Sequence, residues 1–120
     1  QCVLRLLTGN PNNGKRHELP LFEIPDLNPH HLAVTYTAGR LACYLNGTLV
    51  SEQTISGTFG PWTTQHLLFG DEWNGNREWQ GSLSGVAIYN RAISAEEVAR
   101  NTLHYKLRHG EPPNENRAAK

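Results

Sequence analysis

The sequence lacks several features, and each absence narrows the choice of fold and function. It contains no methionine, so Gln1 is not a translation start; we expect that a leader or a larger N-terminal region has been removed, or that the chain is part of a longer one. Eleven Lys and Arg balance eleven Asp and Glu, which gives no electrostatic reason to expect a nucleic acid or an anionic membrane as partner. No run approaches the roughly 18 apolar residues that a membrane span needs.

Cysteine is also scarce. Cys2 and Cys43 are too few for the disulfide scaffold of a small secreted domain. Both lie in apolar runs typical of strands, so they are predicted to be buried thiols that pack as small hydrophobic side chains. A bridge between them requires neighbouring strands, and the sequence leaves their disulfide state open.

The chain is built from short apolar segments separated by clusters of Gly, Pro and Asn, which is typical of an all-β protein. Strands are expected at residues 2–7, 18–24, 31–37, 41–45, 48–55, 66–69 and 78–89. Asn46-Gly47 between two of them is a strong hairpin signal, because both central residues of a type I′ turn need a positive φ. A two-residue turn there predicts Tyr44 opposite Leu49 and Cys43 opposite Val50, which would be the next pair along.

One helix is expected, beginning at Ser94 and stopping at Gly110. Ser94 and Glu97 have the spacing of a capping box, in which each side chain accepts a hydrogen bond from the other residue's backbone N–H. The helix is predicted to bury a stripe formed by Val98, Leu103 and Leu107. The residues that follow, 110–120, are polar and aperiodic and are interpreted as a flexible tail.

Four segments, in order, carry a more specific pattern. They are 30–36 (HHLAVTY), 40–47 (RLACYLNG), 67–70 (LLFG) and 79–97 (WQGSLSGVAIYNRAISAEE). This order resembles the laminin-G-like family of the concanavalin-A-like lectin/glucanase superfamily. The resemblance implies an all-β fold: an antiparallel two-sheet jelly-roll sandwich over residues 1–109, closed by one short C-terminal helix. It also implies that Trp79, at the family's aromatic strand-entry position, lies in the core.

The sequence departs from the family in two ways. Ser84-Gly85 and Thr37-Ala38 replace positions where the family commonly carries carboxylates that support a calcium site. The family's N-terminal strands are missing, although a jelly roll needs roughly eight strands. Either residues 1–24 cover the sheet in a compressed fold, or strands outside this chain complete it.

The carboxylates and histidines do not form a pattern typical of an enzyme. Glycosidases on this fold place paired carboxylates on one strand, commonly as E-x-D-x-x-E, and no such triplet occurs. Asp71 and Glu78 could converge across a loop, but the pattern strongly favours solvated loop charges. His30-His31 point to opposite faces of a strand and make a poor metal chelate, which favours a structural role. The chain is therefore predicted to be non-catalytic and to need no cofactor.

The polar loop 70–77 is the candidate binding site. Its hard oxygen ligands suit Ca²⁺ at Asp71, Glu72 and Asn76, with ordinary turn chemistry as the alternative. An exposed indole among amides and carboxylates can stack on a sugar or anchor a protein. The candidate ligand-binding residues are Trp62, Asp71, Trp73, Asn74, Asn76 and Arg77.

Three functions remain open from the sequence. The first is a non-catalytic interaction module, an accessory or structural part that binds another protein, or the remainder of a larger chain, in an assembly. The second is a carbohydrate-binding module that uses the 70–77 loop, and the third is a hydrolase. The family resemblance implies an extracytoplasmic location: periplasmic, cell-surface or secreted. The ligand and the partner are not identified by the sequence.

Overall fold

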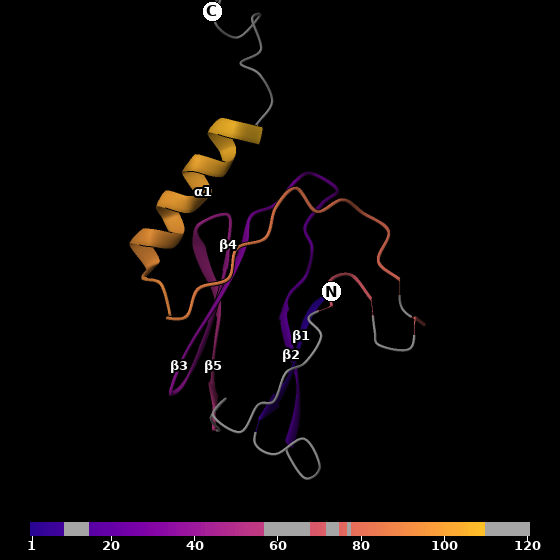
Figure 1. Ribbon diagram of the computed structural model, residues 1–120, viewed down its shortest axis with the longest axis vertical. Helices are drawn as coiled ribbons and strands as arrows, with labels where there is room; N and C mark the ends of the chain where they lie inside the picture. The colour runs from indigo at the N-terminus through magenta and orange to yellow at the C-terminus, as the bar shows by residue number, and fades with distance from the viewer. Residues whose placement is uncertain (9–14, 57–67, 72–74, 77, 110–120) are drawn as a thin grey trace, which may run out of the picture.

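The computed structural model describes residues 1–8, 15–56, 68–71, 75–76 and 78–109. Within these ranges the chain forms strands and one helix, all labelled in Figure 1: β1 (Cys2–Thr8), β2 (Lys15–Phe22), β3 (Leu32–Thr37), β4 (Gly39–Leu45), β5 (Thr48–Ile55) and α1 (Ala95–His109). The strands pair antiparallel as a two-stranded sheet, β1-β2, and a three-stranded sheet, β3-β4-β5. The predicted class, an antiparallel two-sheet sandwich with one short C-terminal helix, is confirmed.

The β4–β5 hairpin forms as the sequence predicts. Asn46 has φ 52° and Gly47 has φ 86°, the two left-handed positions that a type I′ turn requires. The turn is tied back to the start of β3, because the backbone N–H of Asn46 donates to the His31 carbonyl at 2.8 Å. A short turn between β3 and β4 likewise uses Gly39, at φ 83°.

The strand register follows the prediction for one pair and departs from it at the next. Tyr44 lies opposite Leu49 as expected, but Cys43 lies opposite Ser51 rather than Val50. Val50 is an extra residue on β5, which makes a β-bulge beside the turn. The prediction for Cys43 was wrong because it assumed an unbroken register.

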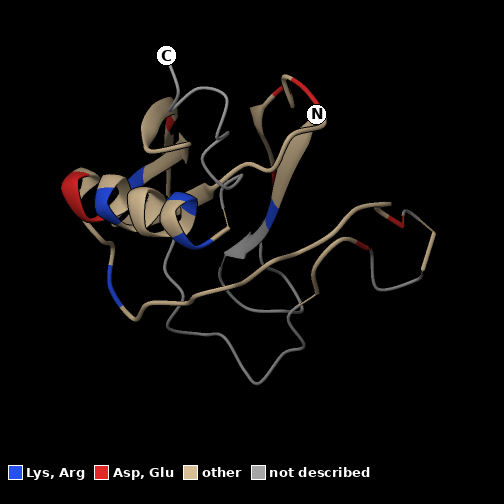
Figure 2. Ribbon diagram, turned by 90° about the horizontal axis from the view of Figure 1, so that it is seen from above, with Lys and Arg blue, Asp and Glu red and all other residues tan. Residues whose placement is uncertain are grey.

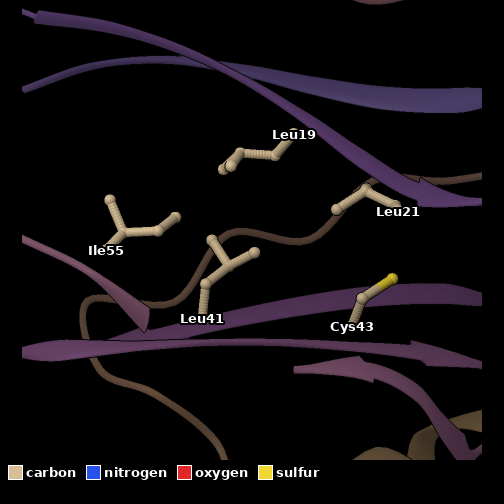
Figure 3. Close-up of a cluster of buried hydrophobic side chains, with 5 residues drawn as sticks. All are labelled: Leu19, Leu21, Leu41, Cys43 and Ile55. Atoms are coloured by element: carbon tan, nitrogen blue, oxygen red, sulfur yellow. The ribbon is translucent and has the colours of Figure 1, made fainter. Parts of the chain in front are cut away.

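A hydrophobic core fills the space between the two sheets. β2 contributes Leu19 and Leu21, β4 contributes Leu41 and Cys43, and β5 contributes Ile55 (Figure 3). Partly buried side chains pack around this cluster: Cys2, Leu4, Phe22 and Tyr36. The N-terminal hairpin therefore covers one face of the β3-β4-β5 sheet, as the compressed arrangement of residues 1–24 predicts.

A second, smaller core lies on the opposite face of the same sheet. Ala42 and Tyr44 of β4 point there and pack with Ile93 and with Val98 of α1. β4 is thus buried on both faces, which explains why its apolar residues run continuously instead of alternating with polar ones.

The helix begins with the predicted capping box. The Glu97 backbone N–H donates to the Ser94 hydroxyl at 3.2 Å, and the Ser94 N–H donates to the Glu97 carboxylate at 2.8 Å. Arg91 adds two hydrogen bonds to the same carboxylate. Acidic side chains lie at the start of the helix and basic ones further along it (Figure 2), the distribution that the helix dipole favours. No helix in the described ranges has the length and apolar content to cross a membrane.

The predicted apolar stripe of the helix is only partly correct. Val98 is fully buried, but Leu103 is 56% exposed and Leu107 is 76% exposed. Thr102 is buried in their place, against the β4–β5 turn. The cause is the position of α1, which packs its first half on one end of the sheet and continues beyond it (Figure 1).

The strand predicted for residues 78–89 does not form. This segment has no regular secondary structure, and every residue in it is exposed. A strand needs a neighbour for its backbone N–H and C=O groups, and no described segment offers one. For the same reason Trp79, predicted to be core, is 49% exposed. Of the strand expected at 66–69, the described residues 68 and 69 are also irregular, and the tail 110–120 lies outside the described residues.

Candidate functional site

The loop that carries the predicted site is closed at its base by the backbone. The Trp79 N–H donates to the Gly70 carbonyl at 2.6 Å. Gly70 (φ 73°) and Gly75 (φ 67°) both adopt the left-handed conformation that glycine enters at least cost. The Trp79 indole lies against Gly81, where an added Cβ would meet the indole Cε2 at 2.7 Å, so a larger residue at position 81 would force the half-exposed indole to shift.

The structure describes only part of the predicted ligand set. Asp71 and Asn76 are both exposed on the loop. The remaining candidates lie outside the described residues: Trp62, Glu72, Trp73, Asn74 and Arg77. In the described part of the chain no group of three or more His, Cys, Asp or Glu side chains is placed to hold a metal ion. The calcium site at Asp71, Glu72 and Asn76 therefore stays a prediction.

The carboxylates weighed as an acid/base pair, Asp71 and Glu78, are both exposed. A glycosidase acid needs a sheltered carboxyl whose pKa is raised by burial or by a close like charge. The geometry of these two side chains gives no support to such a pair.

A different feature dominates this side of the molecule: an exposed apolar segment. Its large side chains are between 48% and 73% exposed, and they are Trp79, Leu83, Val86, Ile88 and Tyr89. Apart from the Trp79 N–H, the backbone of this segment makes no hydrogen bond to another part of the described main chain. Contiguous exposed apolar side chains on a segment that pairs with no described strand are typical of an interaction surface.

This exposed segment is fixed at both ends. Trp79 ties its beginning to the 70–79 loop. Ile93 is buried with Val98 just beyond its end, and the Asn101 amide donates to the Tyr89 hydroxyl at 3.1 Å. The segment between these anchors is therefore held on the molecule while its apolar side chains face solvent.

This exposed surface was not predicted, although the apolar pattern of residues 82–89 indicates it. In residues 82–89 the apolar side chains fall on both alternating faces, with Leu83 and Ala87 on one and Val86 and Ile88 on the other. That pattern is typical of a strand buried on both sides, which needs neighbours that the chain does not supply in the described part.

A hydrogen-bonded network joins the helix to the hairpin and to the loop before β3. The Asn46 side chain accepts from the His31 N–H at 2.9 Å and donates to His30 Nδ1 at 2.9 Å. His30 Nε2 lies 2.9 Å from the Asp26 carboxylate, and His31 Nδ1 lies 2.9 Å from the Thr102 hydroxyl. Burial lowers the pKa of His31. Both histidines therefore make structural hydrogen bonds, but they lie in the loop before β3 and not on opposite faces of a strand, as the sequence had suggested.

Comparisons with known proteins agree with this architecture. A family model described as "Concanavalin A-like lectin/glucanases superfamily" matches residues 7–99. No curated protein matches the chain. A crystal structure of an S-layer domain-containing protein (residues 221–444) from Clostridium thermocellum ATCC 27405 is similar, with a TM-score of 0.53 and 20% identity. The similarity covers 82% of this chain and 49% of that one, so the chain spans about half the length of that structure.

Proposed function

The chain belongs to the concanavalin A-like lectin/glucanase superfamily, and from this premise we propose that it is a non-catalytic interaction module that joins a protein partner. The partner is a separate subunit or the remainder of a larger protein. The proposal is carried by one observation: the segment 79–89 presents large apolar side chains to solvent and has no neighbouring strand among the described residues.

Strand addition is the mode of binding that this segment suits. A strand added beside an exposed backbone satisfies its N–H and C=O groups, while alternate side chains enter pockets of the partner. Burying a large aliphatic side chain contributes roughly 1.5–3 kcal/mol. Ile88 is the most exposed of these side chains at 73%, so a partner can bury more of its surface than of any other side chain in the segment.

The length comparison supports the same proposal. The similarity covers 49% of a solved chain, which therefore contains about as many residues again that this chain does not match. In this proposal, strands contributed by the partner supply the neighbour that the 79–89 segment lacks in the described part of the chain. We place the assembly outside the cytoplasm because the similar structure belongs to an S-layer domain-containing protein, and because the resemblance to laminin-G-like domains implies that location.

Ile88→Asp tests this interface. The charge would be buried in the complex but solvated in the free chain, so we expect the affinity for the partner to fall roughly 30- to 150-fold, from a loss of about 2–3 kcal/mol. Size-exclusion chromatography with light scattering on the native assembly measures the loss. Leu107→Asp is the matched control, because Leu107 is equally exposed in the free chain but lies on α1. Equal dissociation in both variants, or an unchanged assembly with Ile88→Asp, contradicts the proposal.

A second candidate, carbohydrate binding at the 70–77 loop, is favoured by the indole of Trp79. It is half exposed at the base of this loop and is held against Gly70 and Gly81, which suits stacking on a sugar ring. Glycan-array binding that is lost in Trp73→Ala and in Trp79→Ala would support this function. Binding that is unchanged in both variants rejects the site.

A further inference from the structure

The two cysteines come from different sheets but meet in the same core. Cys43 is on β4 and is completely buried, and its sulfur points toward the facing β1-β2 sheet (Figure 3). Cys2 is on β1 and packs against the cluster that contains Cys43. Both are free thiols in this structure.

Both thiols have raised pKa values in this core. Burial, and then repulsion from Cys2, raise the pKa of Cys43 to about 11. Burial also raises the pKa of Cys2, although this side chain is only partly covered.

We propose that Cys2 and Cys43 form a disulfide that joins the two sheets of the sandwich when the protein is in an oxidising environment. A bridge between sheets occurs in other β-sandwiches, where it ties the two layers through the core. It requires the two Cα atoms to approach to roughly 4.4–6.8 Å, closer than the usual spacing of about 10 Å between packed sheets.

The local backbone allows this approach. Cys2 is the first residue of β1, and the register between β1 and β2 shifts between Cys2 and Val3. An irregularity of this kind re-aims a side chain and loosens the pairing at the strand end. Formation of the bond therefore requires a shift of Cys2 toward Cys43, because Cys43 is held on the central strand of a three-stranded sheet.

The chemistry balances with a small-molecule disulfide as the oxidant. The accessible Cys2 thiolate attacks the external disulfide, which forms a mixed disulfide and releases one small thiol. The Cys43 thiolate then attacks the Cys2 sulfur, forms the protein disulfide and releases the second small thiol. The two cysteines lose two electrons and two protons, and the external disulfide takes them up.

The bond would hold together layers that otherwise associate mainly through side chains. An isolated two-stranded sheet such as β1-β2 is marginally stable by itself. Tying Cys2 to Cys43 closes a loop over much of the N-terminal half of the chain, which restricts the unfolded state. Reduction is therefore expected to lower the midpoint of thermal unfolding by on the order of 10 °C.

Mass spectrometry tests the proposal on the full chain. The folded protein is equilibrated with a mixture of oxidised and reduced glutathione, and free thiols are then alkylated under denaturing conditions. We expect no alkylation and a mass about 2 Da below the reduced form. Tryptic digestion without reductant should give peptide 1–5 linked to peptide 41–77. Cys2→Ser, a change at a partly exposed position, should abolish the linked peptide and the effect of reductant on the melting midpoint.

Two results would overturn the proposal. One is a folded chain in which both thiols are alkylated after equilibration. The other is a Cys2–Cys2 bridge between two copies instead of a bond within one chain. Neither result depends on whether the apolar segment 79–89 binds a partner, so this inference and the proposed function fail separately.

Discussion

At the scale of single residues, two titratable side chains, His31 and Glu97, stabilise the fold in different pH ranges. His31 is partly buried beside Thr102, and this burial lowers its pKa from the usual 6.5. Arg91 and the Ser94 N–H lower the pKa of Glu97 to about 2. Stability that comes from His31 is thus lost first on acidification, and stability that comes from Glu97 is lost later.

The lowered pKa of His31 predicts that the free energy of unfolding decreases as the pH falls from 7 to 5. A histidine with a lowered folded-state pKa stabilises the fold above its unfolded pKa, and this contribution disappears as the pH falls toward the folded value. One proton limits the slope to about 1.4 kcal/mol per pH unit. Urea unfolding at the two pH values should show a smaller loss for His31→Gln than for the wild type. Equal losses would contradict the role of His31.

At the scale of elements, the hairpin turn is where the backbone conformation is most demanding. Gly47 combines φ 86° with close packing, since an added Cβ would lie 3.4 Å from the Thr102 hydroxyl oxygen. The same turn anchors the His31 backbone through Asn46. The turn therefore supports both the sheet and the contact with α1.

Gly47→Ala should destabilise the protein by about 1–2 kcal/mol, because an L-residue in the left-handed region clashes with its own backbone. Gly85→Ala is the matched control, since an added Cβ there meets nothing within 4 Å and the residue does not have a left-handed φ. Urea unfolding gives the free energy of unfolding of both variants. If Gly85→Ala lowers the free energy of unfolding as much as Gly47→Ala does, the left-handed turn position is not the cause of the destabilisation.

The elements that could be predicted from sequence are those specified locally. Asn46-Gly47 determines its hairpin, and Ser94 with Glu97 determines the start of α1, because the interacting groups are only a few residues apart. The exposure of Leu103 depends on how α1 packs on the sheet, and the bulge at Val50 breaks the regular register that the turn alone implies; no short pattern encodes either. Of the candidate loop site, the sequence identified residue types; their arrangement is described only for Asp71 and Asn76.

At the scale of the whole molecule, the described residues form two packed sheets and leave one apolar segment without a neighbouring strand among them. The β3-β4-β5 sheet is covered on one face by β1-β2 and on the other by the start of α1. The 79–89 segment, which resembles the closing strand of the family, lies beside no strand in the described part of the chain. Its sequence is typical of a strand, but no described strand lies beside it to pair with its backbone.

Amide hydrogen exchange over residues 82–89 tests this account most directly. In the isolated chain we expect these amides to exchange nearly as fast as those of an unstructured peptide, while the amides of β4 are protected. In the native assembly the same amides should become protected, because a neighbouring strand accepts their hydrogen bonds. Strong protection of residues 82–89 in the isolated chain, or none in the assembly, would contradict the claim that this segment is completed by a partner.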